Sequence, residues 1–206
     1  MNKRIIKNFF VFEGIDGSGT TTQIKLLKDF LEKNHKSIFQ TAEPTNFETG
    51  IFLRRCLSGE ISVQAETMVM LFAADRNEHL FSEQGILRAA TQYDIVLSDR
   101  YLFSSLAYQG ASGYLDLAKK LNADFPLPEV LFFFQVDIDT ALQRIEKRAA
   151  QKEIYETKPF QQRVAEMYTQ VLDLYKASGM KIITVDANET LETVHRQIRD
   201  IFTERN

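Results

Sequence analysis

Continuous apolar runs, rather than alternating ones, dominate the hydrophobic pattern of this chain. Three strong runs, 9–13 (FFVFE), 93–99 (YDIVLSD) and 130–137 (VLFFFQVD), and two weaker ones, 37–41 (SIFQT) and 181–186 (KIITVD), predict strands. Unbroken apolar strands are typical of parallel sheets that helices cover on both faces. We therefore expect five strands buried in the centre of the fold.

Between these strands, apolar residues recur at helical spacing. The stripes are Ile24, Leu27, Phe30 and Leu31; Phe160, Val164, Met167 and Val171; and Leu191, Val194, Ile198, Ile201 and Phe202. Each stripe predicts an amphipathic helix. Strands that alternate with helices predict an α/β fold, a doubly wound, five-stranded parallel sheet with ligands at the carboxyl ends of its strands. No shift in composition marks a boundary, so we expect one domain over residues 1–206.

Charge and cysteine content narrow the classes of function. A net charge of −3 argues against a general binder of nucleic acid or membrane surfaces, which needs a basic excess. One cysteine, Cys56, excludes an intramolecular disulfide and a cysteine-rich metal site, and it favours a reducing compartment. No apolar run reaches the length of a membrane span. We expect a cytoplasmic location.

The segment GIDGSGTTTQ (residues 14–23) follows the first strand and leads into a predicted helix. It fits the phosphate-loop pattern G-x-x-x-x-G-K-[ST], in which backbone N–H groups and the helix dipole hold phosphates and the last hydroxyl binds Mg²⁺. The predicted phosphate-binding residues are Gly14, Asp16, Gly17, Ser18, Gly19, Thr20, Thr21 and Thr22. A glycine-rich helix start without a ligand, capped by Ser18 or Thr20, is the alternative.

Threonine stands at position 20, where the pattern has a lysine that holds the β- and γ-phosphates. A hydrogen bond to a charged group contributes about 1.5–3 kcal/mol, so another cation must offset the loss. Arg144, Lys147 and Arg148 lie at i, i+3 and i+4 on one predicted helix face and are the best candidates. Because glutamates are interspersed, a solvated face is the alternative reading.

Two further segments carry candidate chemistry. Asp99 ends a strand, the usual place for a magnesium-organising carboxylate, and Arg100 beside it offers a fork for a phosphate. A salt bridge between these two is the alternative. In LFAADR, Phe72 and Arg76 lie one helical turn apart, so the ring can stack on a base whose edge the arginine bonds. Taken alone, Phe72 is more often a core residue.

Together these segments resemble the thymidylate kinases, which phosphorylate thymidine 5′-monophosphate (dTMP). The resemblance extends from FFVFEGIDGSG through EP, LFAADR, SDRYLFSSLAYQG and IYETKPFQQRV to VDAN (185–188), nearly the whole chain. Its most specific part is the stretch DRY-x-x-S-x-x-A-Y-Q-G with LF-x-A-x-R upstream. It implies transfer of the γ-phosphoryl group of Mg²⁺-ATP to dTMP, a homodimer, and a LID segment at about residues 144–158.

The resemblance also implies a role for each matching residue. The residues that would contact dTMP are Asp16, Glu43, Pro44, Phe72, Arg76, Arg100, Ser104, Ser105, Tyr108, Gln109 and Tyr155. Those that would contact adenine are Arg144, Asp186, Ala187 and Asn188, and those that would act in catalysis are Asp16, Arg100, Arg144 and Arg148. Thr21 and Asp99 would hold Mg²⁺. Asp16 would face the sugar 3′-hydroxyl, Tyr108 would crowd the 2′ position, and Tyr155 would close over the acceptor.

Members of the family carry the catalytic arginine either in the phosphate loop or in the LID segment. Gly17 occupies the loop position here, so the chain resembles the second kind, in agreement with the basic residues from position 144 onward. Two positions depart from the family pattern. Thr20 replaces the lysine, and Ile154 stands where some members carry an arginine.

Phosphoryl transfer to a monophosphate needs positioning and charge neutralisation rather than a strong base, because the attacking oxygen is already ionised. Three alternatives stay open. A deoxynucleoside kinase would need a carboxylate base, for which Glu13 and Glu43 are candidates. A catalytically impaired nucleotide-binding homologue would explain the missing lysine. A scaffold without a ligand would leave so complete a pocket unexplained.

Overall fold

A parallel sheet of five strands, in the order β2-β3-β1-β4-β5, forms the centre of the computed structural model, which describes residues 4–147, 154–155 and 157–203. The strands are β1 (Ile5–Gly14), β2 (Ile38–Ala42), β3 (Ile95–Asp99), β4 (Leu127–Gln135) and β5 (Lys181–Asp186). The five predicted strands are present, and the prediction of an α/β fold with a five-stranded parallel sheet is confirmed.

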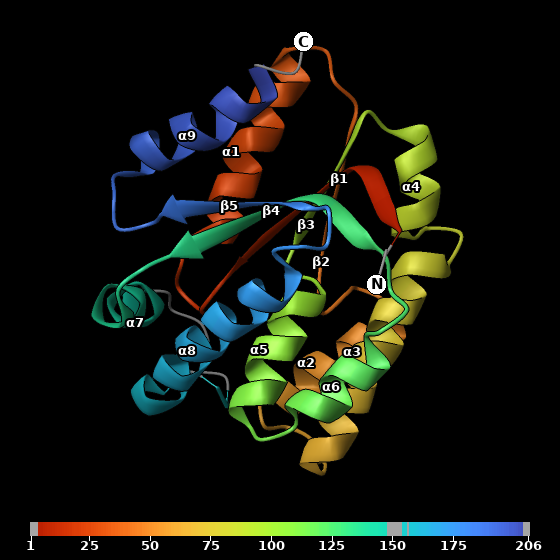
Figure 1. The fold of residues 1–206 in the computed structure, drawn as a ribbon, viewed down its shortest axis with the longest axis vertical. Coiled ribbons are helices and arrows are strands. Elements are labelled where there is room, and N and C mark those ends of the chain that lie inside the picture. The colour runs from red at the N-terminus through yellow and green to blue at the C-terminus, as the bar shows by residue number, and fades with distance from the viewer. Residues whose placement is uncertain (1–3, 148–153, 156, 204–206) are drawn as a thin grey trace.

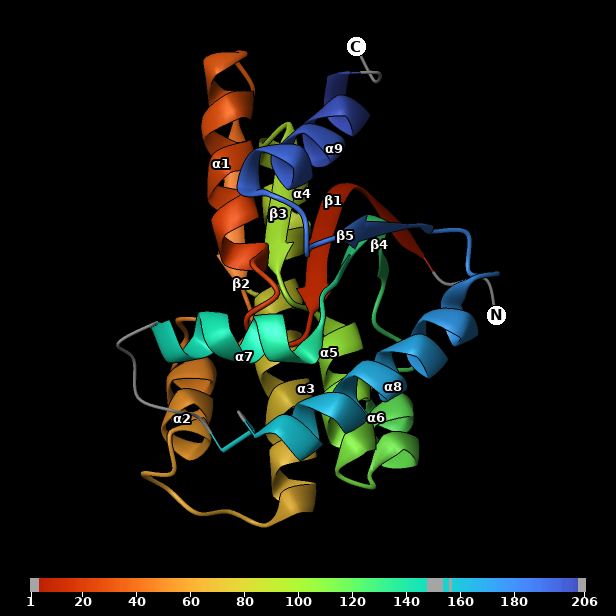
Figure 2. The ribbon, with the colours of Figure 1, turned by 90° about the vertical axis from the view of Figure 1, so that its left-hand side faces the viewer.

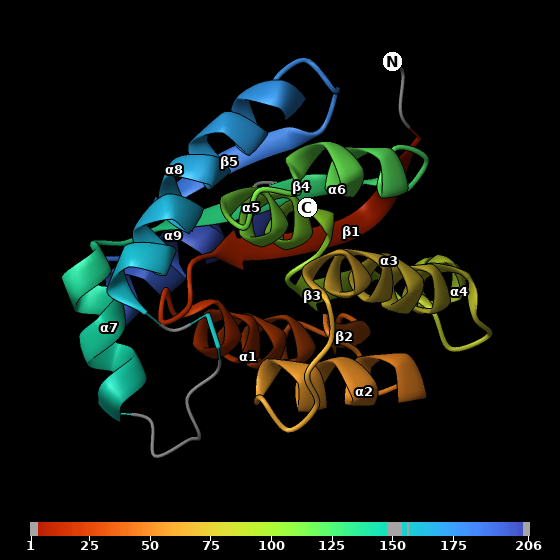
Figure 3. The same ribbon diagram turned by 90° about the horizontal axis from the view of Figure 1, so that it is seen from below.

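Helices cover both faces of this sheet, as a doubly wound fold requires. They are α1 (Thr20–Lys33), α2 (Glu48–Leu57), α3 (Ala65–Phe81), α4 (Ile86–Gln92), α5 (Leu102–Ala111), α6 (Leu115–Leu121), α7 (Ile138–Lys147), α8 (Lys158–Tyr175) and α9 (Leu191–Thr203). Helices α1 and α9 lie on one face, and α5 and α8 lie on the other (Figure 1). The view from below shows α2 and α3 on the side of β2 and β3 (Figure 3).

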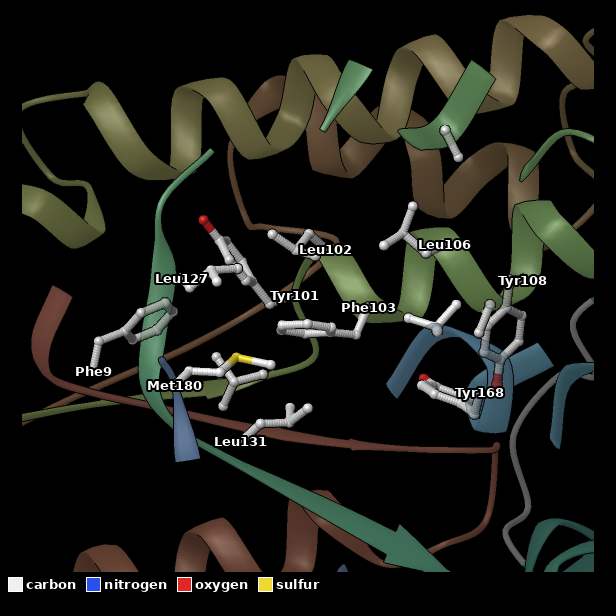
Figure 4. Packing of buried hydrophobic residues seen from close by; sticks show 14 of the residues in the cluster. Phe9, Tyr101, Leu102, Phe103, Leu106, Tyr108, Leu127, Leu131, Tyr168 and Met180 are labelled. Carbon is white, nitrogen blue, oxygen red and sulfur yellow. The ribbon is translucent and has the colours of Figure 1, made fainter. Parts of the chain in front are cut away.

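The unbroken apolar run of β1 has a direct structural cause. Successive side chains of a strand point to opposite faces, and both faces of this strand are buried. Phe9 and Val11 pack into the cluster under α5 and α8, whereas Phe10 and Phe12 pack into the cluster under α1 and α9. Figure 4 shows the first cluster, in which the Tyr101 ring meets Phe9 edge-on at 5.3 Å between ring centroids.

The parallel strands bring the predicted site residues to one edge of the sheet. Phe12 of β1 is in register with Asp99 of β3, so the phosphate loop after β1 and Arg100 after β3 leave the sheet side by side. Helix α7, which follows β4, runs along this edge (Figure 2). An ideal Cβ at Gly17 would lie 2.3 Å from the carbonyl oxygen of Ala141 in α7, so the helix packs directly on the loop.

Part of the predicted LID segment lies outside the described residues, namely 148–153 and 156. The expectations of a LID at about 144–158 and of one domain over residues 1–206 therefore stay predictions. In the described ranges, no helix is both long and apolar enough to span a membrane.

Candidate functional site

A cleft of about 820 Å³ opens at the carboxyl edge of the sheet. This volume is in the usual range for small-molecule sites, about 300–1,000 Å³. Most of the predicted site residues line it: Asp16, Gly17, Ser18, Gly19, Thr20, Thr21, Thr22, Glu43, Pro44, Phe72, Arg76, Asp99, Arg100, Ser104, Ser105, Tyr108, Gln109, Arg144, Tyr155 and Ala187. Residues that lie far apart in the sequence thus share one cleft, and their functional roles stay predictions.

Three predicted residues of the described ranges, Gly14, Asp186 and Asn188, are not part of this lining, and a fourth, Arg148, falls outside those ranges. Gly14 ends β1 behind the loop. Asp186 and Asn188 bond to each other, since Oδ1 of Asp186 accepts from the Asn188 backbone N–H and from its Nδ2, both at 3.0 Å. The two side chains shape the turn after β5 instead of facing the cleft.

The phosphate loop enters α1 without a side-chain cap. Gly19 occupies the N-cap position with φ 94°, and no side chain of the described residues caps the helix, so neither Ser18 nor Thr20 plays the capping role. The first N–H groups of a helix have no partner within it, and they are therefore available to an anion in the cleft. Because a Cβ at Gly17 would collide with α7, an arginine does not fit at this loop position.

Arg100 is tied to the phosphate loop rather than to its neighbour Asp99. Its backbone has φ 70°, in the left-handed region that residues with a Cβ rarely occupy. Nη2 lies 2.6 Å from Oδ1 of Asp16, and Nη1 donates to the Gly14 carbonyl at 3.0 Å and to the Ser104 hydroxyl at 3.1 Å. The proposed salt bridge between neighbours is thus replaced by an ion pair between two elements of the site.

Asp99 pairs with Thr21 of the loop. Oδ2 of Asp99 accepts a short hydrogen bond from the Thr21 hydroxyl, and Oδ1 is buried with no hydrogen-bond partner among the described residues. The described ranges hold no group of three or more His, Cys, Asp or Glu side chains arranged for a metal. Mg²⁺ in kinases uses only one or two protein oxygens together with phosphates and waters. This hydroxyl and carboxylate therefore fit a magnesium ion.

Arg76 lies in a buried wall of the cleft, 1% exposed, one helical turn after Phe72 on α3. Its Nη2 lies 2.5 Å from Oε2 of Glu43 and 2.8 Å from the Ser105 hydroxyl, and its Nη1 lies 2.5 Å from Oδ1 of Asn122. Its Nε has no hydrogen-bond partner among the described residues. The guanidinium is thus fixed in place before any ligand binds.

Glu43 is in turn oriented by His79, a residue that the sequence analysis did not select. Nδ1 of His79 lies 3.0 Å from Oε1 of Glu43, and Nε2 lies 2.6 Å from the hydroxyl of Thr41. His79 follows Arg76 by three residues, so both reach the same face of α3. That spacing is the only sequence signal that pointed to this contact.

Glu13 is fully buried behind the cleft and does not line it. Its Oε1 accepts from the backbone N–H groups of Tyr101 and Ser104, and its Oε2 accepts from the hydroxyls of Ser104 and Tyr168. Burial raises the pKa of Glu13 to about 7, against the lowering effect of the Ser104 and Tyr168 hydrogen bonds and of the Arg100 charge. With Glu43 bonded to Arg76, neither carboxylate nominated as a nucleoside-kinase base is free in the cleft.

Besides Arg76 and Arg100, two further arginines line the cleft, Arg144 and Arg54. On α7, Arg144 lines the cleft and its Nη2 donates to the Ala187 carbonyl at 2.9 Å, whereas Lys147 is exposed and does not line it. On α2, Arg54 also lines the cleft and donates to the Pro44 carbonyl. Sequence reasoning missed Arg54, because nothing in the pattern of α2 shows which side faces the cleft.

Tyr155 closes one side of the cleft through its ring contacts. The ring stacks on Phe160 at 4.8 Å with an interplanar angle of 10° and lies 5.7 Å from the ring of Tyr108. The Arg100 guanidinium carbon lies 5.2 Å from the Tyr108 ring centre. An aromatic wall therefore adjoins the arginine predicted to hold the acceptor phosphate.

Comparison with known proteins agrees with this arrangement. A protein-family model described as "Thymidylate kinase" matches residues 12–198. The chain is 42% identical over 198 residues to a putative thymidylate kinase of Treponema pallidum, with 94% of each chain covered. It is 37% identical over 196 residues to a probable thymidylate kinase of Methanococcus aeolicus, again with 94% of each covered. It is 36% identical over 204 residues to a thymidylate kinase of Leptospira interrogans, which covers 98% of this chain and 95% of the relative.

Proposed function

The chain belongs to the thymidylate kinase family, whose members transfer the γ-phosphoryl group of ATP to dTMP to give dTDP and ADP, and we propose that the cleft described above is where this chain does so. The observation that carries the proposal is the ion pair of Arg100 with Asp16. It sets a phosphate-binding fork directly against the phosphate loop, at 2.6 Å, within one cleft. Donor and acceptor phosphates can therefore meet there.

The acceptor end of the cleft has the chemistry that dTMP requires. Phe72 stacks on the thymine ring and Arg76 bonds its edge, while Ser105 and Gln109 complete the wall of that pocket. Arg100 holds the 5′-phosphate through its guanidinium fork, which a lysine cannot match. Its contact with Asp16 leaves that carboxylate beside the sugar, where it can accept a hydrogen bond from the 3′-hydroxyl.

The part of the cleft that would bind ATP consists of the backbone at the start of α1 and the turn that follows β5. The N–H groups at the start of α1 hold the ATP phosphates, and Arg144 lies against adenine beside Ala187. The attacking oxygen of dTMP is already ionised, so the residues neutralise and align charge instead of removing a proton. Thr21 and the half-buried carboxylate of Asp99 would hold Mg²⁺, which would supply further neutralisation of phosphate charge.

Loop N–H groups and Arg144 together take over the charge that a lysine at position 20 would provide, while Arg100 holds the acceptor phosphate against the loop. Arg100 supports this proposal through its contacts with both the Gly14 carbonyl and Asp16. Arg148 stays a candidate for the same task from outside the described residues. The loss of the lysine then lowers the rate rather than abolishing turnover.

A coupled assay of ADP formation with Mg²⁺-ATP tests the proposal, with dTMP as acceptor and thymidine as control. We expect turnover that depends on dTMP and not on thymidine. Turnover of thymidine alone would assign the chain to the nucleoside kinases. Binding of ATP and dTMP without turnover would identify a catalytically impaired homologue.

We also propose that the chain forms a homodimer through α2 and α3. Three large apolar side chains on these helices are exposed in the single chain: Ile51 by 45%, Met70 by 53% and Phe81 by 57%. Exposed apolar groups of this size favour a protein interface. Sedimentation equilibrium would show a dimer that Met70→Asp dissociates, and a monomer in the unaltered chain would refute the proposal.

The cytoplasmic location stays a prediction from the single free cysteine.

A further inference from the structure

Gln161 is a buried polar side chain that the proposed chemistry does not use. It lies in the first turn of α8, is 1% exposed, and does not line the cleft. Its Oε1 accepts from the backbone N–H of Asp16 at 3.2 Å. Its Nε2 donates to Oδ2 of Asp16 at 2.7 Å and to the carbonyl of Tyr155 at 2.9 Å. One side chain thus joins the phosphate loop, α8 and the aromatic wall of the cleft.

The pattern of these bonds requires an amide at this position. Both protons of the Nε2 group face oxygen acceptors, and Oε1 faces an N–H donor. The reversed orientation would set the amide oxygen against a carboxylate and a carbonyl, which have nothing to donate. A buried polar group without partners costs free energy, so the orientation of Gln161 is fixed by its surroundings.

Asp16 is held from two sides as a result. Arg100 bonds its Oδ1 at 2.6 Å, and Gln161 bonds its Oδ2 at 2.7 Å. Each carboxylate oxygen has a second lone pair, so both can still accept a hydrogen bond from a substrate hydroxyl. Because the Arg100 fork is also the proposed binding group for the acceptor phosphate, Gln161 is the contact that keeps Asp16 oriented while Arg100 binds substrate.

We propose that Gln161 is a positioning residue for the acceptor, which orients the Asp16 carboxylate toward the sugar 3′-hydroxyl of dTMP. It touches no substrate and acts through Asp16. The link to the Tyr155 backbone sets the carboxylate and the aromatic wall at a fixed separation around the sugar. This inference rests on the proposed role of Asp16 in acceptor binding.

The sharpest test compares two acceptors, dTMP and 3′-deoxythymidine 5′-monophosphate, which lacks the 3′-hydroxyl. Gln161→Met keeps the length of the side chain and removes all three hydrogen bonds. For dTMP we expect kcat/KM to fall about tenfold or more, the usual effect of losing a hydrogen bond to a charged group. For the 3′-deoxy acceptor we expect a loss of less than about twofold, because the interaction that Gln161 supports is already missing.

Gln162 provides a matched control, since it is the next residue on α8 and is exposed. Gln162→Met should leave kcat/KM unchanged for both acceptors. Equal losses on the two acceptors in Gln161→Met would overturn the proposal, because a merely structural side chain affects both alike. If the unaltered chain did not turn over dTMP at all, the proposed function itself would fail, and this inference with it.

A second variant, Gln161→Glu, tests the same role through pH. The ionisable groups that face position 161 are Asp16, Arg100 beyond it, and the phenol of Tyr108. A glutamate there sets two carboxylates together, which raises the pKa of the pair. When the pH is lowered, the glutamate becomes protonated and regains a hydrogen-bond donor. The ratio of the activity of Gln161→Glu on dTMP to that of the unaltered chain should therefore rise, as should its ratio to the activity of Gln162→Glu. A pH profile parallel to that of the unaltered chain would overturn the proposal.

Discussion

The guanidinium of Arg76 and the carboxylate of Glu43 meet at 2.5 Å in a wall of the cleft where both side chains are almost fully buried, 1% and 4% exposed. Each charge is tolerated there because the other is present. Breaking a buried pair on one side costs about 3–5 kcal/mol, since it leaves an uncompensated charge. The geometry of this pair therefore contributes to stability as well as to the proposed recognition of the base.

Replacing only one member of this pair should destabilise the fold strongly. For Arg76→Met, we expect a loss of about 3–5 kcal/mol in the free energy of unfolding, measured by urea denaturation without substrates. The double variant Arg76→Met with Glu43→Gln should recover a large part of that loss, because no buried charge remains unpaired. Equal destabilisation of the single and double variants would contradict this account of the wall.

Arg100→Lys should impair the acceptor side selectively. A lysine keeps the charge but cannot reach Asp16, the Gly14 carbonyl and Ser104 together, because it lacks the planar fork. We expect kcat/KM for dTMP to fall about 10²–10³-fold, as for the loss of a group aimed at developing charge, with KM for ATP nearly unchanged. Steady-state kinetics at varied dTMP and varied ATP separate the two effects. A loss confined to KM for ATP would show that Arg100 serves the donor.

Restoring the loop lysine should raise turnover. Thr20 is 7% exposed at the first position of α1 and lines the cleft, so Thr20→Lys would place an ammonium group among the ATP phosphates. We expect kcat on dTMP to increase about 10- to 100-fold, the effect of one added charge-assisted hydrogen bond. Asn34→Lys adds the same charge at the far end of the same helix and serves as control. An equal gain in both variants would point to net charge alone.

Asp99→Asn should weaken the use of Mg²⁺. The substitution keeps the shape of the side chain but removes the charge beside Thr21. We expect the Mg²⁺ concentration for half-maximal activity to rise about tenfold, as for a lost charge-assisted contact, with KM for dTMP little changed. A chelator should abolish activity in the unaltered chain. An unchanged Mg²⁺ titration would exclude Asp99 from the metal site.

Glu13→Gln should change how stability depends on pH. The pKa of Glu13 is raised by burial from 4.5 to about 7, so the folded state binds the proton more tightly than the unfolded state. This contribution to stability is fully present below pH 4.5 and is lost as the pH rises through about 7. Relative to the unaltered chain, Glu13→Gln should therefore gain up to about 3 kcal/mol between pH 5 and pH 8. Urea unfolding at both pH values checks the difference, and a constant difference would contradict the raised pKa.

The sequence alone predicted the sheet well, because apolar runs covered on both faces leave a plain signal. Phe9 to Phe12 are all apolar since successive side chains enter two separate cores. The placement of the phosphate loop and of Asp99 at one edge followed from the parallel arrangement. These features depend on local sequence and on the order of the strands, and the hydrophobic pattern of the chain shows both.

Contacts between distant segments were not predictable in the same way. The partner of Arg100 is Asp16, 84 residues away, and Arg100 also has a positive φ, which no residue pattern indicates. His79 and Gln161 look like ordinary helical residues, because a sequence does not show which polar side chain faces a buried carboxylate. The exclusion of a side chain at Gly17 follows from the packing of α7, which comes more than a hundred residues later.

The contact between Gln161 and Asp16 has a consequence during synthesis of the chain on the ribosome. The two residues are 145 positions apart, so the phosphate loop leaves the ribosome long before the amide that orients it. At synthesis rates of about 5–20 residues per second, that interval is of the order of ten seconds. A nascent chain that ends before α8 carries the glycine-rich loop without its oriented aspartate. With the role proposed for Gln161, competence to phosphorylate is acquired late in translation, when the last quarter of the chain emerges.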